Sequence, residues 1–294
     1  MDILRECRLC PRNCGVDRHK SRGYCRQGDK IKIARADLHL WEEPPICTKN
    51  GSGAIFFCGC TLGCCFCQNF EISQGDVGYE ISVSELADIM LSLQEKGACN
   101  INLVSATPFI PMVKEAIDLI RDKLEIPVVF NCGGYETVDT IRSLDEYVDI
   151  YLPDLKYFSS ELSGKYSRAT DYFEVATKAI AEMVRQVGKP KFQGEGLVRG
   201  VIVRHLVLPS HRADSIAVME YLGRTYKSDE ILLSIMSQYT PIFRSCEFPE
   251  INRRVTTFEY EKVLDFAEKY GFRWYIQGKA SATKDFIPTF YNEK

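Results

Sequence analysis

The sequence predicts an α/β fold built on a parallel sheet, and three observations support this prediction. From Ala54 onward, short apolar runs alternate with longer segments of helical periodicity, which is the pattern of βα units. Hydrophobic residues make up 45% and charged residues 26% of the 294 residues, as in ordinary globular domains. The first 50 residues differ, because they are polar and punctuated by Gly, Pro and Cys. We therefore expect a cysteine-rich metal-binding module over residues 1–50 and an α/β domain over residues 51–294.

The N-terminal module contains only one strand-like run, Lys30 to Arg35, which comes before the Pro44-Pro45 pair. The first βα unit then joins the apolar run AIFFCG at 54–59 to a helix at 84–96, whose apolar residues recur every three to four positions.

The second and third units repeat this pattern. The second joins NINLVS at 100–105 to a helix at 111–123, which follows Pro108 and Pro111 because proline suits the start of a helix. The third joins PVVFNC at 127–132 to a short helix at 137–144.

The fourth unit contains the longest predicted helix, at 171–187, with Asp171 placed to cap it. Six parallel strands with helices outside suit either an open doubly wound sheet or a partial (β/α)6 barrel. The other predicted elements are strands at 148–155, 201–208 and 230–236 and helices at 213–223 and 257–270.

Charge and hydropathy support neither a nucleic-acid partner nor a membrane partner. Thirty-seven Lys and Arg against 40 Asp and Glu give a net charge of −3, which offers no basic surface for nucleic acid. No apolar stretch approaches the length of a membrane span, and no charged segment followed by an apolar run opens the chain. We therefore expect a cytoplasmic protein with no nucleic-acid or membrane partner. In a reducing cytosol, the 13 cysteines are better explained as ligands of metals or clusters than as disulfides.

The sharpest motif is CGCTLGCCFCQN at 58–69, in which Cys60, Cys64 and Cys67 have the spacing C-x3-C-x2-C. Three sulfurs in one tight loop can bind one face of an iron–sulfur cube. An electron-transfer [4Fe–4S] cluster usually has four thiolate ligands, so three leave one iron free to bind another molecule. Structural zinc usually takes four ligands in two separated pairs and fits this spacing poorly. Cys58 and Cys65 are expected to be packing thiols.

This loop resembles the signature of the radical S-adenosylmethionine (SAM) superfamily, including the aromatic Phe66 before the last cysteine. CQN after the motif, PDLK at 153–156 and RHLVLP at 204–209 resemble the branch related to pyruvate formate-lyase activating enzyme. The N-terminal CRLCPRNCG and the late EINRR and DFIP resemble a poorly characterised subgroup of that branch. The resemblance implies a partial (β/α)6 barrel, with a [4Fe–4S] cluster after the first barrel strand and SAM across the strand ends.

A second group of cysteines lies in the N-terminal module, with the spacing C-x2-C-x3-C-x10-C. Four thiols this close indicate one closed site, and the few apolar residues around them provide no core in which to bury them. Zinc and a second iron–sulfur cluster both take four thiolates, with zinc slightly favoured here. These residues are Cys7, Cys10, Cys14 and Cys25.

Polar residues at the strand ends are the expected SAM ligands, because ligands of parallel α/β folds bind there. Relatives often carry Gly-Gly-Glu where Ser105-Ala106-Thr107 stands here, so Ser105 and Thr107 are candidates for the SAM ammonium, or else cap a helix. The resemblance implies that Asp154, in the D-x-K element that ends with Lys156, helps to hold a small cation beside SAM. The alternative is that Asp154 and Lys156 form an ion pair at the mouth of the barrel.

Further candidates lie on or just after the predicted strands at 127–132, 201–208 and 230–236. Arg204 is expected to bind the SAM carboxylate, because a planar guanidinium suits a carboxylate, while the adjacent His205 must point to the other face. Asn131 stands near where the resemblance places another acidic ligand, which puts the cation in doubt. Gln238 and Tyr239 are candidate contacts of adenine or substrate.

The function that follows is reductive cleavage of SAM and hydrogen abstraction by the resulting 5′-deoxyadenosyl radical. The resemblance implies a one-electron donor such as flavodoxin or ferredoxin, and its substrate could be a glycine of a partner glycyl-radical enzyme. The Asp-Gly-Pro-Gly element of many such activases has no counterpart here, so small molecules and other peptides stay open. The alternative from a different class is a non-catalytic iron–sulfur or zinc protein.

Overall fold

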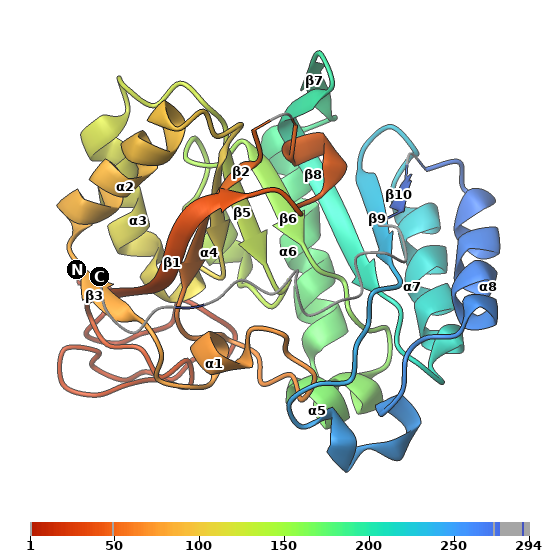
Figure 1. The fold of residues 1–294 in the computed structure, drawn as a ribbon. Coiled ribbons are helices and arrows are strands. Elements are labelled where there is room, and N and C mark those ends of the chain that lie inside the picture. Colours follow the sequence, from red (N-terminus) through yellow and green to blue (C-terminus); the bar gives the residue numbers. More distant parts are fainter. Residues whose placement is uncertain (1, 49, 273, 277–289, 291–294) are drawn as a thin grey trace.

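The computed structural model describes residues 2–48, 50–272, 274–276 and 290. Its centre is a sheet in the order β10-β9-β8-β6-β5-β4-β2-β1-β3, with β7 paired to β8 beside it (Figure 1). The strands are β1 Ile31–His39, β2 Ser52–Phe57, β3 Tyr79–Ile81, β4 Ile101–Val104, β5 Val128–Cys132, β6 Ile150–Pro153, β7 Lys191–Gln193, β8 Gly196–Leu206, β9 Leu232–Met236 and β10 Trp274–Ile276.

The α-helices are α1 Phe70–Ser73, α2 Val83–Glu95, α3 Ile110–Ile120, α4 Val138–Arg142, α5 Ser160–Ser167, α6 Tyr172–Val187, α7 Arg212–Thr225 and α8 Thr257–Glu268. Short 3-10 turns are η1 Pro44–Ile46, η2 Thr107–Phe109, η3 Ser245–Glu247 and η4 Pro249–Ile251. None of the described helices is long and apolar enough to cross a membrane.

The six central strands decide between the two predicted architectures. β2, β4, β5, β6, β8 and β9 are neighbours in chain order, and every adjacent pair is parallel. A doubly wound sheet reverses its strand order at a switch point, whereas a barrel keeps the chain order. The partial barrel is therefore confirmed, and among the described strands the sheet path stays open at β3 and β10.

Each predicted βα unit is present, and the differences have local causes. β8 begins at Gly196, before the predicted residue 201, because β7 pairs with its first residues as an antiparallel hairpin. The short polar helix α5 has no strong apolar periodicity and was not predicted. Asp171 does not cap α6 with its side chain, because its carboxylate accepts a 2.6 Å hydrogen bond from Tyr135 Oη instead.

The strand-like run in the N-terminal segment is the start of β1, which extends to His39. β1 pairs antiparallel with both β2 and β3, so it belongs to the barrel sheet. The expected boundary at residue 50 therefore divides β1 from the sheet that it extends. The preceding cysteine-rich loops lie at the same end of the molecule as α1 (Figure 1).

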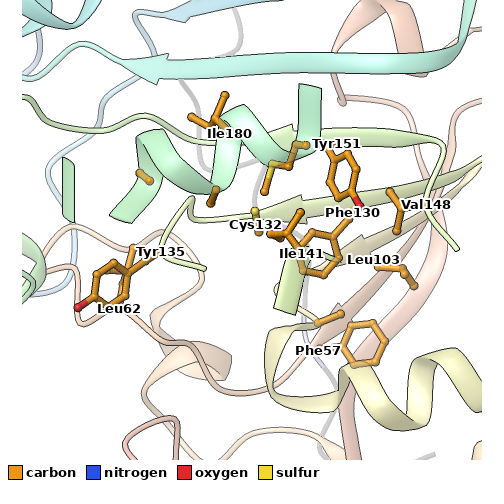
Figure 2. Close-up of a cluster of buried hydrophobic side chains, with 14 of the residues drawn as sticks. Phe57, Leu62, Leu103, Phe130, Cys132, Tyr135, Ile141, Val148, Tyr151 and Ile180 are labelled. Carbon is orange, nitrogen blue, oxygen red and sulfur yellow. The ribbon is translucent and has the colours of Figure 1, made fainter. Parts of the chain in front are cut away.

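The outer face of the sheet packs against the helices. Alternate strand residues, including Phe57, Leu103, Phe130 and Tyr151, point into a large hydrophobic core between the sheet and the helices, together with Ile141 of α4 (Figure 2). Because strand side chains alternate between faces, the residues between them point to the inner face.

The inner face is apolar at its floor. Ile46 of η1 packs there against strand residues of β5, β6, β8 and β9, including Ile150, Ile202 and Leu232. This apolar floor closes one end of the barrel interior, so polar side chains farther along the same strands line the remaining space.

Candidate functional site

A cavity of about 300 Å³ lies at the carboxyl ends of the barrel strands and along the inner face. A volume of this size is typical of small-molecule sites. Its walls come from the loop after β2, the ends of the barrel strands and the segment between β1 and η1. Most of the predicted cluster-loop and strand-end residues line it, namely Cys60, Cys64, Phe66, Cys67, Ser105, Asn131, Asp154, Lys156, Arg204 and Gln238.

The loop after β2 presents Cys60, Cys64 and Cys67 to this cavity. Gly59 gives the loop its turn, since it has φ of +81° and a side chain there would collide with the Cys25 carbonyl. Cys58 and Cys65 are absent from the lining: Cys58 Sγ donates to the Val77 carbonyl at 3.1 Å, and the backbone of Cys65 bonds to that of Tyr166. This arrangement supports the predicted packing role of both residues.

The chemistry of the three thiols fits an iron–sulfur cluster. Burial raises the pKa of Cys60, Cys64 and Cys67, and the pKa of Cys67 reaches about 11. The charge of a Cys64 thiolate raises the pKa of Cys60 and Cys67 further. Buried thiolates are costly unless a positive charge compensates them, and iron ions supply that charge. These three residues would therefore hold the cluster at the cavity.

Asp154 is at the centre of an ion-pair network beside the thiols. Arg204 Nε lies 2.9 Å from Asp154 Oδ1, and the Lys156 ammonium contacts the other carboxylate oxygen. Burial alone would raise the pKa of Asp154, but the two cations outweigh it and hold this pKa below its usual value. Asp154 is therefore ionised, and two protein cations already compensate its charge. This arrangement agrees with the alternative interpretation, in which Asp154 and Lys156 form an ion pair.

Asn131 explains part of the departure from the family pattern. Its Oδ1 accepts a 2.7 Å hydrogen bond from Arg204 Nη2, so it orients the guanidinium. An amide at this position adds no negative charge to the network. Asn131 thus acts here on Arg204, where the resemblance placed an acidic ligand of a cation.

The two adjacent residues of β8 point to opposite faces, as predicted. Arg204 lines the cavity, whereas His205 is buried on the helix side, where its ring nitrogens bond the Leu155 carbonyl at 2.7 Å and Ser215 of α7 at 2.9 Å. Burial lowers the pKa of His205, so the ring is neutral and has a structural role.

The segment after β4 corrects one prediction. Ser105 lines the cavity in the left-handed conformation, with φ of +61°, and its N–H donates to the Asn131 carbonyl. Thr107 is buried and does not line the cavity; its side chain instead bonds Glu136. Neither residue caps a helix with its side chain, because η2 and α3 lack such caps. Of the two candidates, Ser105 lines the cavity and Thr107 does not.

The aromatic residue of the cysteine loop is fixed by the loop after β9. The Phe66 ring lies edge-on to Tyr239 at 5.6 Å between centroids. The Tyr239 hydroxyl donates to the Ile251 carbonyl, which holds it outside the cavity, and Gln238 lines the cavity. Gln238 is therefore the better placed of the two candidate contacts.

Burial is the main cause that raises the pKa of Cys10 to about 12, and the charges of the Cys25 and Cys14 thiolates also raise it. These three N-terminal cysteines therefore lie near one another. This segment is fastened to the cluster loop, since Arg12 Nε donates to the Thr61 carbonyl at 2.8 Å. In the part of the chain that is described, no three His, Cys, Asp or Glu side chains surround a single metal-ion position. Zinc and a second cluster both stay predictions. The late DFIP lies outside the described residues.

Sequence reasoning missed the segment between β1 and η1. His39, Trp41, Glu42 and Glu43 line the cavity, although they belong to the expected N-terminal module. The Pro44-Pro45 pair signals a chain reversal here, but adjacent acidic residues carry no periodicity that would show which one points inward. Only the return of this segment across the barrel places both carboxylates there.

Comparisons with known proteins agree with this geometry. A sequence profile of the radical SAM superfamily matches residues 54–211. An uncharacterized protein from Methanocaldococcus jannaschii is 32% identical over 281 residues, covering 92% of this chain and 76% of that protein.

Solved structures share the fold. A radical SAM methyltransferase from Sphaerobacter thermophilus matches with a TM-score of 0.52 and 14% identity, over 77% of this chain and 66% of that one. Streptococcus suis SuiB bound to S-adenosylmethionine matches with a TM-score of 0.51 and 11% identity, over 74% of this chain and 48% of that one. This chain thus spans less than two thirds of either solved protein. By its sequence profile and its cysteine loop, the chain belongs to the radical SAM superfamily, whose enzymes bind a [4Fe–4S] cluster and SAM.

Proposed function

We propose that the protein is an activating-enzyme-like radical SAM oxidoreductase that abstracts a hydrogen atom from its substrate. The observation that carries this proposal is the convergence of three thiols and the Asp154–Arg204 pair on one cavity. When bound, the reduced cluster supplies one electron that cleaves the sulfonium C–S bond of SAM, giving methionine and a 5′-deoxyadenosyl radical that takes the hydrogen.

The chain's own residues bind and orient SAM. Arg204 would bind the SAM carboxylate, since its guanidinium lines the cavity and Asn131 fixes its plane. Lys156 would compensate the charge of Asp154 when Arg204 binds the SAM carboxylate. Ser105 would accept from the SAM ammonium at the end of β4, and the Phe66 ring would border the adenosyl group.

The barrel interior protects the reaction. The floor formed by Ile46 and its apolar neighbours excludes water from the far side of the cavity. Exclusion of water and of competing hydrogen donors is what a radical enzyme requires of its protein.

The expected partners follow from the resemblance to the activating-enzyme branch. We propose flavodoxin or ferredoxin as the one-electron donor, in the cytoplasm, and a glycyl-radical enzyme as the partner whose backbone glycine is the substrate. The motifs at 153–156 and 204–209 support this branch. A small molecule or another peptide is the alternative substrate.

The test of SAM cleavage uses anaerobically reconstituted protein, dithionite and SAM, with 5′-deoxyadenosine and methionine measured by chromatography. We expect both products in equal amounts, and neither product from a variant with Cys60, Cys64 and Cys67 all replaced by Ala. A protein that carries the cluster and binds SAM but forms no 5′-deoxyadenosine with any reductant would contradict the proposal. A glycyl-radical EPR doublet on a co-purified partner would identify the activase role.

A further inference from the structure

Glu43 is a buried carboxylate that no step above uses. It lines the cavity, yet only 1% of its surface is exposed. Its Oε2 atom is buried and has no hydrogen-bond partner. A buried carboxylate without a full set of partners is costly, so a cationic ligand in the cavity would stabilise it.

The surroundings of Glu43 place it on the inner face of the barrel. Arg204 on β8 and the hydroxyl of Ser234 on β9 lower the pKa of its carboxyl group. The charges of Glu42 and Asp154 raise this pKa. Arg204 and Ser234 are opposite each other in the register of β8 and β9. Burial is the largest effect and raises the pKa of Glu43 to about 7.

The two permanent cations among the described lining residues already have partners when SAM is bound. The lining residues include three carboxylates, of Glu42, Glu43 and Asp154, and two permanent cations, Lys156 and Arg204. Asp154 compensates one of these cations and the SAM carboxylate compensates the other. Two glutamates then face the cavity without a permanent cation among its lining residues to pair with them.

SAM itself brings two cations, a sulfonium and an ammonium, and both are poor candidates for this pairing. The sulfonium is expected beside Cys60, Cys64 and Cys67, because the cluster that they would hold cleaves its C–S bond. The ammonium is expected at another strand end, beside Ser105 at the end of β4, whereas Glu43 lies against β8 and β9. β5 and β6 separate β4 from β8 in the sheet. The cationic group that meets Glu43 must therefore come from another molecule.

We propose that Glu43 binds a protonated amine or guanidinium group of the substrate, so that the enzyme selects cationic substrates. This inference rests on the proposed function, which supplies the radical that the bound substrate meets. Two sources carry such a group: a small amine, and a lysine or arginine side chain next to a reacting peptide residue. In either case its positive charge is what Glu43 recognises.

The test measures binding to the reconstituted holoenzyme with SAM, by ligand-observed NMR. The probes are n-butylammonium, the neutral n-butanol and the anion butyrate, with the peptide acetyl-Gly-Lys-Gly-amide to distinguish a peptide source from a small amine. We expect n-butylammonium or the peptide to bind best, and Glu43→Gln to weaken that binding about tenfold or more, since a buried charge pair is lost.

The matched control is Glu136→Gln. Glu136 is also 1% exposed and also has an unpartnered buried Oε2, but it does not line the cavity. It should leave probe binding unchanged. Equal binding of all probes, preference for butyrate, or no effect of Glu43→Gln would overturn the inference, and so would a loss of SAM affinity in Glu43→Gln. Failure of the wild-type protein to cleave SAM would overturn the proposed function alone, because probe binding does not require cleavage.

Discussion

Replacing Arg204 with Met tests the expected SAM site most directly. Met keeps much of the side-chain volume but removes the guanidinium, whose Nε lies 2.9 Å from Asp154 and whose Nη2 lies 2.7 Å from Asn131. Asp154 retains Lys156 as a partner, so the network loses one of its two cations and stays charge-compensated. The main loss is then the partner of the SAM carboxylate.

The size of this loss follows from the burial of the site. The Arg204 side chain is only 16% exposed, so solvent replaces the missing charge poorly. A charge-assisted hydrogen bond in such a place contributes about 2 kcal/mol, and we expect about a 30-fold rise in the SAM dissociation constant. Equilibrium dialysis with labelled SAM measures it, and iron and sulfide content should stay at the wild-type level.

Arg199→Met is the matched control, because Arg199 lies on the same strand but bonds the carbonyls of Gln186 and Val187 at the end of α6. It should leave SAM affinity within about twofold of wild type. An Arg204→Met protein with a full cluster and an unchanged SAM dissociation constant would refute the assignment, and Arg204 would then serve only to hold Asp154.

Three further outcomes are expected. Cys64→Ala should lose the cluster and Cys65→Ala should keep it, by iron and sulfide analysis, because Cys64 alone of the two lines the cavity; the reverse result would show that the ligand assignment is wrong. A variant lacking Cys60, Cys64 and Cys67 should retain one zinc at the N-terminal cysteines, whereas residual iron and sulfide would identify a second cluster, and neither would remove that site. The affinity for n-butylammonium should rise from pH 6 to pH 8, since the cation binds the ionised carboxylate of Glu43, whose pKa is raised to about 7; a Glu43→Gln protein should show a flat profile, and an equal slope in both proteins would contradict this origin.

The features that depend on short-range spacing could be predicted from the sequence alone. Six apolar runs alternating with periodic helices were sufficient to predict six parallel strands, because burial on both faces gives each strand an apolar run. The C-x3-C-x2-C motif predicted the ligand loop, since three residues within eight positions share one local turn. Alternation along β8 also predicted that Arg204 faces the cavity and His205 the helices.

Only the tertiary structure decided which distant residues meet. The chain-ordered strands, and with them the barrel, depend on pairing between segments that local periodicity does not specify. Thr107 bonds Glu136 and does not line the cavity, and Asn131 accepts a hydrogen bond from Arg204. Both contacts join residues from different strand ends. Glu43 entered the cavity because the chain crosses from β1 to η1, and nothing in its immediate sequence shows that path. The physical reason is that spacing fixes the direction of a side chain only within one element, whereas a site is formed where several elements converge.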